Sequence, residues 1–222
     1  MERIIISLGG SLIVPEKVDI EFLKQFRKVI LKRPEKFMVI CGGGKICREY
    51  QAASQKITET KKVDLDWIGI KSTRLNAELV RAIFANEAYQ EVITNPTKKF
   101  ATKKKIIVGA GYMPGCSTDT DAVLLAKNVG ADTIINLSNV EYVYDKDPKK
   151  FADAKPLSRM TWKQFTKIFG RKWVPGLNAP FDPIAATEAS RLKLKVVIMK
   201  GSELKNLENY LEGKGCKGTV IL

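Results

Sequence analysis

Short apolar runs recur along this chain, and segments with helical periodicity lie between them. The run over 3–8 is rich in isoleucine and the run over 37–41 is apolar at every position, a pattern typical of strands buried on both faces of a parallel sheet. Between them, Asp19 stands where an N-cap is expected for a helix that extends to about Lys32. The apolar face predicted for this helix consists of Ile20, Leu23, Phe26, Val29 and Ile30.

The same alternation continues to the end of the chain. Further strands are predicted over 91–94, 106–109, 133–137, 196–199 and 219–222. Helices are predicted from Lys45 onward and over 66–86, 120–130, 161–169 and 183–192. The buried positions predicted for the helix over 66–86 are Ile70, Leu75, Leu79, Val80 and Ile83. A polar segment over 138–155 contains an Asp147-Pro148 turn, and a later loop carries Pro175-Gly176.

Because strands alternate with helices throughout, we predict an α/β fold with a mainly parallel central sheet between two helical layers, a three-layer αβα sandwich. We find no linker or repeat that would divide the chain, so residues 1–222 are predicted to form one domain. Ligands of such folds collect at the carboxyl ends of the strands, and we expect the same here.

Three predicted strands run directly into glycine-rich turns, at Gly9-Gly10, at Gly42-Gly43-Gly44 and over 109–115. Without a Cβ the backbone approaches an anion closely, and exposed N–H groups at a helix start favour phosphate oxygens. One such turn is commonly a mere tight connection. Three at one sheet edge indicate several phosphates bound side by side, although neither GxxxxGK[ST] nor a convincing GxGxxG is present.

The composition narrows the chemistry further. The chain has no histidine, which excludes nucleophilic catalysis that depends on a Ser-His or Cys-His pair. Phosphoryl transfer needs little acid/base help and is therefore favoured. The four cysteines are scattered without C-x-x-C spacing, so we expect neither a structural metal nor a disulfide.

The formal net charge of +14 favours anionic partners but does not choose among them. The lysines are dispersed and no aromatic residues are interleaved with them, so we rank nucleic-acid binding last and interpret most of the charge as a solvated face. The apolar run in the opening MERIIISLGG is too short for a signal peptide, and no apolar run elsewhere approaches the length of a membrane span. A cytoplasmic protein without a membrane partner is expected.

Seven sequence blocks in order resemble the amino-acid kinase superfamily and, within it, the uridylate kinases of the archaeal type. The resemblance extends essentially from Arg3 to Leu222, and the blocks are SLGGSLIVP, GGGKICREY, DWIGIKSTRLNA, MPGCSTDTDAVLLA, NLSNVEYVYDKDPKK, APFDPIAA and KGTVIL. The resemblance implies Mg²⁺-dependent transfer of the γ-phosphoryl group of ATP to UMP in pyrimidine biosynthesis, by direct in-line attack. It also implies an acceptor-binding part over about 1–130, an ATP-binding part over about 131–222 and a homohexamer.

On the ATP side, the resemblance implies contacts from both glycine turns and from the segment after the strand over 133–137. The implied residues are Gly9, Gly10, Gly44, Arg48, Ser138, Asn139, Tyr144 and Asp147. Without the resemblance, Arg48 would be an exposed helix arginine, and the segment over 138–147 would be a turn after a strand.

On the acceptor side, Asp66 resembles the carboxylate that accepts hydrogen bonds from ribose hydroxyls, and Thr118 resembles a reader of the uracil edge. The remaining implied contacts are Gly43, Met113, Pro114, Gly115, Cys116, Ser117 and Asp119. Read without the resemblance, Asp66 is a helix N-cap, and Thr118 and Asp119 cap the helix that follows them.

The implied catalytic residues are Arg48, Lys45 and Asp182. Lys45 is a candidate because many relatives carry a lysine two residues before the first glycine, where this chain has Ser7, although Lys45 reads equally well as a solvated helix lysine. Asp182 would orient groups near the phosphates, and it is also a good cap before Pro183. A second departure is Glu141-Tyr142, where relatives usually carry an aspartate followed by a glycine.

Two other readings within reach of the sequence remain open. One is a kinase of the same superfamily with another small phosphate or carboxylate acceptor; isopentenyl phosphate kinases, however, grip their substrate with a histidine that this chain lacks. The other is a relative that binds nucleotides or oxyanions without catalysis, a reading that the departures at Ser7 and Tyr142 favour.

Overall fold

The computed structural model describes residues 2–172 and 179–222, and the predicted loop at Pro175-Gly176 lies outside them. Its sheet has the strand order β3-β2-β1-β4-β8-β9-β7, in which only the β8–β9 pair is antiparallel. The strands are β1 (Arg3–Leu8), β2 (Lys36–Cys41), β3 (Ile106–Gly109), β4 (Thr133–Ser138), β7 (Arg159–Met160), β8 (Lys195–Lys200) and β9 (Thr219–Ile221). A separate two-stranded ribbon pairs β5 (Val143–Tyr144) with β6 (Pro156–Leu157).

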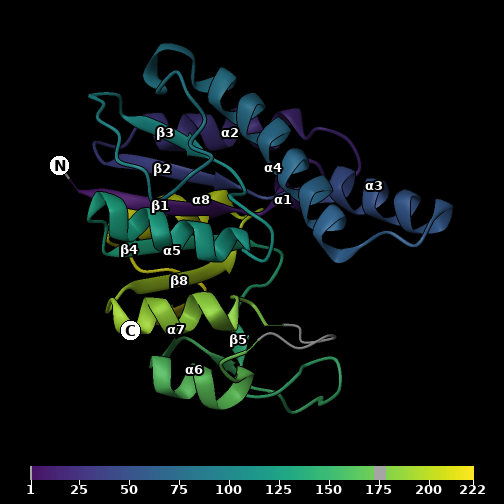
Figure 1. Ribbon diagram of the computed structural model, residues 1–222. Coiled ribbons are helices and arrows are strands. Elements are labelled where there is room, and N and C mark those ends of the chain that lie inside the picture. The colour runs from purple at the N-terminus through teal and green to yellow at the C-terminus, as the bar shows by residue number, and fades with distance from the viewer. Residues whose placement is uncertain (1, 173–178) are drawn as a thin grey trace.

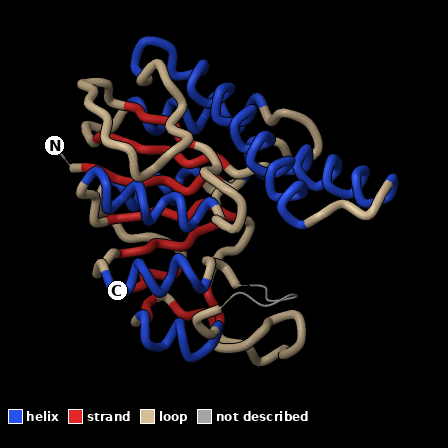
Figure 2. The backbone as a smooth tube through the Cα atoms, viewed as in Figure 1, coloured by secondary structure: helices blue, strands red, loops and turns tan. Residues whose placement is uncertain are grey.

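Helices cover both faces of this sheet, so the predicted three-layer αβα architecture is confirmed (Figures 1 and 2). The helices are α1 (Gly10–Ile13), α2 (Ile20–Leu31), α3 (Gly44–Ile57), α4 (Lys62–Phe84), α5 (Thr118–Val129), α6 (Trp162–Phe169), α7 (Pro183–Arg191) and α8 (Leu204–Leu211), with a 3₁₀ turn η1 (Ala85–Glu87). Figure 1 shows α3 and the end of α4 that lies beside it extending beyond the sheet, away from the N-terminus.

Alternation along β1 divides its side chains between two apolar cores. Ile4 and Ile6 pack in the core shared with α2, α4 and α8. Ile5 packs in the opposite core, with residues of α5, α6 and α7. Successive side chains of a strand point to opposite faces, which places Ser7 on the side of Ile5.

The strand order places a topological switch point between β1 and β4. The chain adds β2 and β3 on one side of β1 and then returns to β4 on the other. The Gly9 amide, just beyond β1, donates to the Leu137 carbonyl of β4 over 2.9 Å. In open parallel sheets, ligands bind in the crevice at such a reversal.

Several predicted helix boundaries are confirmed by their caps. Asp19 accepts the Phe22 amide at 2.9 Å, and Asp182 accepts the amides of Ile184 and Ala185 at 2.6 and 3.2 Å. Thr161 forms a capping box with Gln164 at the start of α6. Polar side chains ahead of apolar periodic segments therefore located helix starts correctly.

Other local predictions were wrong. Ile20 and Leu75, expected in the core, are each 60% exposed, because apolar periodicity does not show how far a helix extends past its neighbours. The strand expected over 91–94 is reduced to isolated bridges at Ala88 and Ile93. Helices α1 and α8 were not predicted; α1 is a single turn, too short to show a period.

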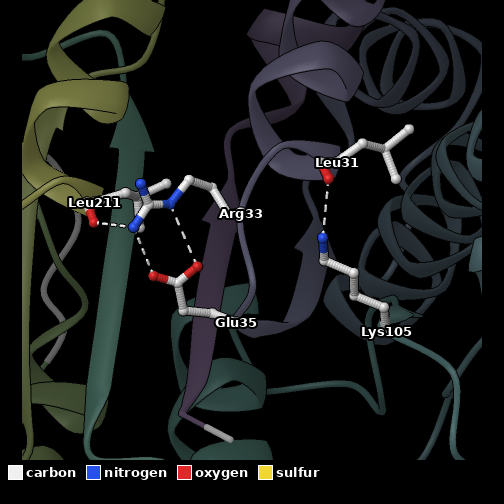
Figure 3. Close-up of polar contacts among 5 residues, drawn as sticks. All are labelled: Leu31, Arg33, Glu35, Lys105 and Leu211. Atoms are coloured by element: carbon white, nitrogen blue, oxygen red, sulfur yellow. Dashed lines mark hydrogen bonds and ion pairs between the residues drawn. The ribbon is translucent and has the colours of Figure 1, made fainter.

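Part of the positive charge stabilises the fold itself. Figure 3 shows Arg33 donating to both Glu35 carboxylate oxygens and to the Leu211 carbonyl at the end of α8. In the same figure the Lys105 ammonium donates to the Leu31 carbonyl at the end of α2, over 3.0 Å. Arg27 donates in the same way to the Ile83 carbonyl near the end of α4, over 2.6 Å. Cations suit these positions because carbonyls at a helix C-terminus lack partners and carry negative partial charge.

Across the described residues, no helix has the length and apolar character needed to cross a membrane.

Candidate functional site

The first two glycine turns pack directly against each other at the ends of β1 and β2. The Gly42 amide donates to the Leu8 carbonyl over 2.9 Å. A Cβ on Gly10 would lie 2.7 Å from the Gly42 carbonyl oxygen, so a side chain there would force the turns apart. Gly44 begins α3 with a φ of 68°, a conformation that favours glycine. The predicted adjacency of these two turns is confirmed.

Polar residues on the buried side of α4 hold the turns in place. Asn76, which is 3% exposed, donates to the carbonyls of Gly42 and Gly43 over 2.8 and 3.1 Å. Thr73 accepts the Gly111 amide at 2.8 Å. Sequence reasoning did not single out either residue. The detectable signal was polar residues on the same helical stripe as Ile70, Ala77 and Val80, which are buried.

The third turn leads into a loop, residues 111–117, that packs against the same helix. Asp66 accepts the Gly115 amide through Oδ2 at 3.0 Å, and Arg74 donates to the Tyr112 carbonyl over 3.2 Å. Asp66 lies inside α4, whose N-cap is Lys61. The reading of Asp66 as a helix N-cap was therefore wrong, and the structure brings Asp66 to the loop that was predicted to act with it.

The loop ends where α5 begins, at Ser117. Ser117 is the N-cap and accepts the Thr120 amide at 3.2 Å. Thr118 and Asp119 are the first residues of the helix itself, so the reading of these two as its caps was wrong. Because Ser117 performs that function, the Thr118 and Asp119 side chains do not serve as the cap and line a cavity instead.

Asp119 connects β1 to α7. Its Oδ1 accepts the Ser7 hydroxyl at 3.2 Å, and its Oδ2 accepts the Asp182 amide at 3.0 Å. Burial, together with the nearby Asp182 carboxylate, raises the pKa of Asp119 to about 6 in spite of these two hydrogen bonds. Asp182 therefore orients Asp119 through its backbone while its own carboxylate caps α7.

A cavity of about 1140 Å³ opens at the carboxyl ends of β1 and β4, where the switch point predicts a ligand. All four residues predicted after the strand over 133–137 line it, together with three predicted residues from the turn after β1 and the start of α5. These seven are Ser138, Asn139, Tyr144, Asp147, Gly9, Thr118 and Asp119. Ser7 and Tyr142, the two departures, line the same cavity.

The β5–β6 hairpin, residues 143–157, supplies a large part of the cavity wall, both from its two strands and from the long loop between them. Asp145 accepts the Lys155 amide at 2.8 Å, and the Asp145 amide donates to the Lys155 carbonyl over 3.1 Å. At the tip Asp147 accepts the Lys149 amide at 3.0 Å, which confirms the predicted turn at Asp147-Pro148.

The two candidate cations on α3 have different surroundings. Arg48 is exposed, and its Nη1 lies 3.4 Å from the hydroxyl of Ser11, which follows Gly10 in α1. Lys45 contacts the Glu16 carboxylate and lies 3.8 Å from Glu49. Arg48 thus reaches the glycine turns, whereas the charge of Lys45 is already balanced by two carboxylates.

Asp121, on the buried side of α5, was not predicted. It is fully buried, its Oδ2 accepts the Tyr112 amide at 3.2 Å, and its Oδ1 has no hydrogen-bond partner among the described residues. Burial, with a smaller contribution from Asp119, raises the pKa of Asp121 to about 7. The available signal was its spacing of four from Leu125, which placed it on the core-facing side.

These features define an α/β protein whose glycine-lined strand ends and adjoining cavity suit phosphate-bearing ligands. Residues 2–200 match the sequence profile of the amino acid kinase family. The chain belongs to that family.

Individual relatives match along essentially the whole chain. A uridylate kinase of Thermococcus kodakarensis is 37% identical and one of Pyrococcus abyssi is 34% identical, each over 99% of both chains. The crystal structure of uridylate kinase from Archaeoglobus fulgidus superposes with a TM-score of 0.84 at 32% identity, with both chains covered completely.

Proposed function

We propose that this protein is a nucleoside monophosphate kinase that transfers the γ-phosphoryl group of ATP to UMP and forms UDP and ADP. The observation that carries the proposal is the arrangement around the packed glycine turns. Gly9 of the first turn lines the cavity at β1 and β4. Helix α4 holds the second turn through Asn76, and it holds the loop over 111–117 through Asp66 and Arg74. The full-length similarity to proteins named uridylate kinases supports UMP as the acceptor.

The acceptor would bind beside α4 and the start of α5, next to the loop over 111–117. Asp66 would bind the ribose hydroxyls: its Oδ1 accepts no hydrogen bond within the described residues, while Oδ2 holds the loop. Gly43 and residues 113–119 would surround the nucleotide, and Thr118 would read the uracil edge. The acceptor part of the chain then extends over about 1–130.

ATP takes the cavity, and the part of the chain from about 131 to 222 supplies most of its walls. A volume of about 1140 Å³ accommodates a nucleoside triphosphate. Tyr144 would contact the adenosine, Ser138 and Asn139 would line its path, and Asp147 would shape the loop. The triphosphate would extend toward Gly9, Gly10 and Gly44, where amides at the starts of α1 and α3 stabilise anionic oxygens.

The reaction is direct in-line attack by a UMP phosphate oxygen on the γ-phosphorus, with release of ADP and no phosphoenzyme. Arg48 is placed to neutralise the transferring group, a role that requires positioned positive charge rather than a base. Lys45 would contribute only if it left Glu16, and Asp182 acts by holding Asp119.

Mg²⁺ would enter with the ATP phosphates and supply charge neutralisation there. Within 2–172 and 179–222, no group of three or more acidic or cysteine side chains is arranged to hold a metal ion. The nucleotide phosphates would be its main ligands, and Asp119, which lines the same cavity as Gly9, would be a carboxylate available beside them.

We also propose a cytoplasmic homohexamer that acts in pyrimidine nucleotide synthesis. The support for self-association is exposed apolar surface on α3, where Ile57 is 83% and Tyr50 is 66% exposed, and on α4, where Leu75 is 60% exposed. Sedimentation velocity would test it: a single species at six chains is expected, and a monomer at micromolar concentration would contradict it.

The function itself is tested by coupled assay of ADP release with Mg-ATP and a panel of nucleoside monophosphates, alongside a thermal-shift panel of the same compounds. We expect turnover with UMP, and stabilisation by UMP in the absence of ATP. Turnover only with another small phosphate or carboxylate would replace the acceptor assignment. Stabilisation by nucleotides without any turnover would favour a binding protein.

A further inference from the structure

The closing KGTVIL segment lies next to the wall of the ATP cavity. Its threonine, Thr219, is the first residue of β9 and is fully buried. β9 pairs antiparallel with β8, with Thr219 opposite Ile198. Gly218 precedes it with a φ of 151°, and a Cβ there would collide with the Ile198 carbonyl. Glycine at this position therefore allows β9 to enter the sheet with Thr219 turned toward the β5–β6 hairpin.

The Thr219 hydroxyl makes two hydrogen bonds, one to each strand of that hairpin. It accepts the Val143 amide at 2.8 Å and donates to the Leu157 carbonyl over 2.5 Å. Val143 and Leu157 are paired partners in the β5–β6 register. One hydroxyl thus joins both strands at the base of the hairpin to the central sheet.

This connection matters because the hairpin belongs to a separate ribbon and not to the seven-stranded sheet. Its position relative to the cavity depends on the chain continuing into β7, on burial of Val143 and on the Thr219 hydroxyl. Tyr144 immediately follows Val143, and both Tyr144 and Asp147 line the cavity. A shift at the base of the hairpin would therefore move the residues that meet the nucleotide.

We infer that Thr219 is a positioning residue of the nucleotide cavity, whose hydroxyl sets the place of the β5–β6 hairpin and so of Tyr144 and Asp147. The inference rests on the proposed function, which assigns this cavity to ATP. Thr219 does not itself line the cavity. Its effect should therefore appear as a change in adenine nucleotide affinity, with little change in UMP affinity.

The test compares Thr219→Val, which keeps the shape and removes the hydroxyl, with Thr219→Ser, which keeps the hydroxyl. Thr133→Val is the matched control: Thr133 is also a buried strand threonine, 2% exposed, but it stands at the amino end of β4, opposite the cavity end. Dissociation constants for Mg-ADP and, separately, for UMP are measured by titration calorimetry on each folded full-length variant.

We expect Thr219→Val to weaken Mg-ADP binding about three- to tenfold, the factor that corresponds to one ordinary hydrogen bond. Thr219→Ser should stay within about twofold of wild type on the same scale, and UMP binding should be unchanged. Thr133→Val should affect neither ligand. Equal Mg-ADP affinity in Thr219→Val and wild type, or equal losses for both ligands, would overturn the inference while leaving the proposed function in place. A wild-type chain that binds UMP but no Mg-ADP would reject the donor assignment, and the inference with it.

Hydrogen exchange of the wild-type protein provides a measurement that does not depend on the variants folding. The Val143 amide should exchange as slowly as the amide of Val197, in the central strand β8, with no ligand bound. Exchange as fast as that of Lys149 in the hairpin tip would show that the base is not held and would contradict the inference. In Thr219→Val, the Val143 amide should exchange at least about tenfold faster.

Discussion

The Ser7 hydroxyl donates to the Asp119 carboxylate across 3.2 Å, from β1 to the first turn of α5. The two residues are 112 positions apart in the chain. Many members of the superfamily carry a lysine at the position of Ser7. In this chain the Asp119 carboxylate is therefore hydrogen-bonded there to a neutral hydroxyl and not to an ammonium group. The pKa of Asp119 is raised by burial to about 6, and no cation among the causes of the shift offsets this.

Replacing Ser7 with lysine should lower the pKa of Asp119. An ammonium within a few ångströms of a carboxylate favours its ionised form and lowers its pKa by about one to three pH units. We expect wild-type kcat to fall on the acid side of about pH 6 as Asp119 takes a proton, and Ser7→Lys to move this limb to lower pH. The measurement is kcat against pH with saturating Mg-ATP and UMP.

Ser7→Met is the matched control for that experiment, since methionine is long but carries neither charge nor hydroxyl. It removes a hydrogen bond that lowers the pKa of Asp119, so its acid limb should move slightly upward. If the lysine and methionine variants moved the limb in the same direction, the limb would not report Asp119.

Arg48→Ala should lower kcat about 10²- to 10³-fold, the range found when one donor to a developing oxyanion is removed. Arg48 is exposed, and within the part of the chain that the structure describes it makes one hydrogen bond, to Ser11, so the circular dichroism spectrum and melting temperature should stay close to wild type. Lys56→Ala, an exposed cation on the same helix, should leave kcat unchanged. Arg48→Ala with near-normal turnover would remove Arg48 from the catalytic group.

Asp66→Asn should raise the KM for UMP about ten- to hundredfold, as expected for loss of a hydrogen bond to a charged group. The KM for ATP should change little, because Asp66 holds Gly115 in the loop over 111–117 and does not line the cavity. Steady-state kinetics with each substrate varied in turn provide the comparison. Asp64→Asn, an exposed neighbour on the same helix, serves as the control. Equal effects on both KM values would contradict the ribose assignment.

Asp121 should make stability fall as pH rises. Its pKa is about 7 in the folded state against 3.8 for the ordinary carboxyl, so the folded protein holds the proton more tightly than the unfolded chain. The stabilisation is complete below about pH 4 and is lost as pH rises to about 7, with a slope of at most about 1.4 kcal/mol per pH unit for one proton.

Asp121→Asn removes this titration, so the free energy of unfolding should fall less steeply between pH 4 and 7. The fall that remains should be the contribution of Asp119. The measurement is the urea midpoint of unfolding at pH 5 and at pH 8. Relative to wild type, the midpoint of the variant should be higher at pH 8 than it is at pH 5. Asp64→Asn should keep the wild-type slope. An unchanged slope in Asp121→Asn would mean that Asp121 is ionised in the fold.

Local signals in the sequence predicted the elements that carry the site. Uniform apolar runs predicted β1 and β2, caps predicted the starts of α2 and α7, and glycines predicted the turns beyond the strands. These succeeded because burial on both faces, capping and close backbone approach each depend on a few neighbouring residues. The prediction that Leu75 is buried was wrong, because its exposure depends on which other elements reach that side of α4.

Local patterns in the chain were therefore enough to establish the α/β class, the run of glycine turns and the residue types that suit phosphate chemistry. Which of these residues act together depends on the folded arrangement, because strand order cannot be read from local pattern. The β1–β4 neighbourhood brings Ser7 to Asp119, the approach of α4 brings Asp66 to Gly115, and the late entry of β9 brings Thr219 to the hairpin. Each contact joins residues distant in the chain, and its geometry depends on how whole layers pack.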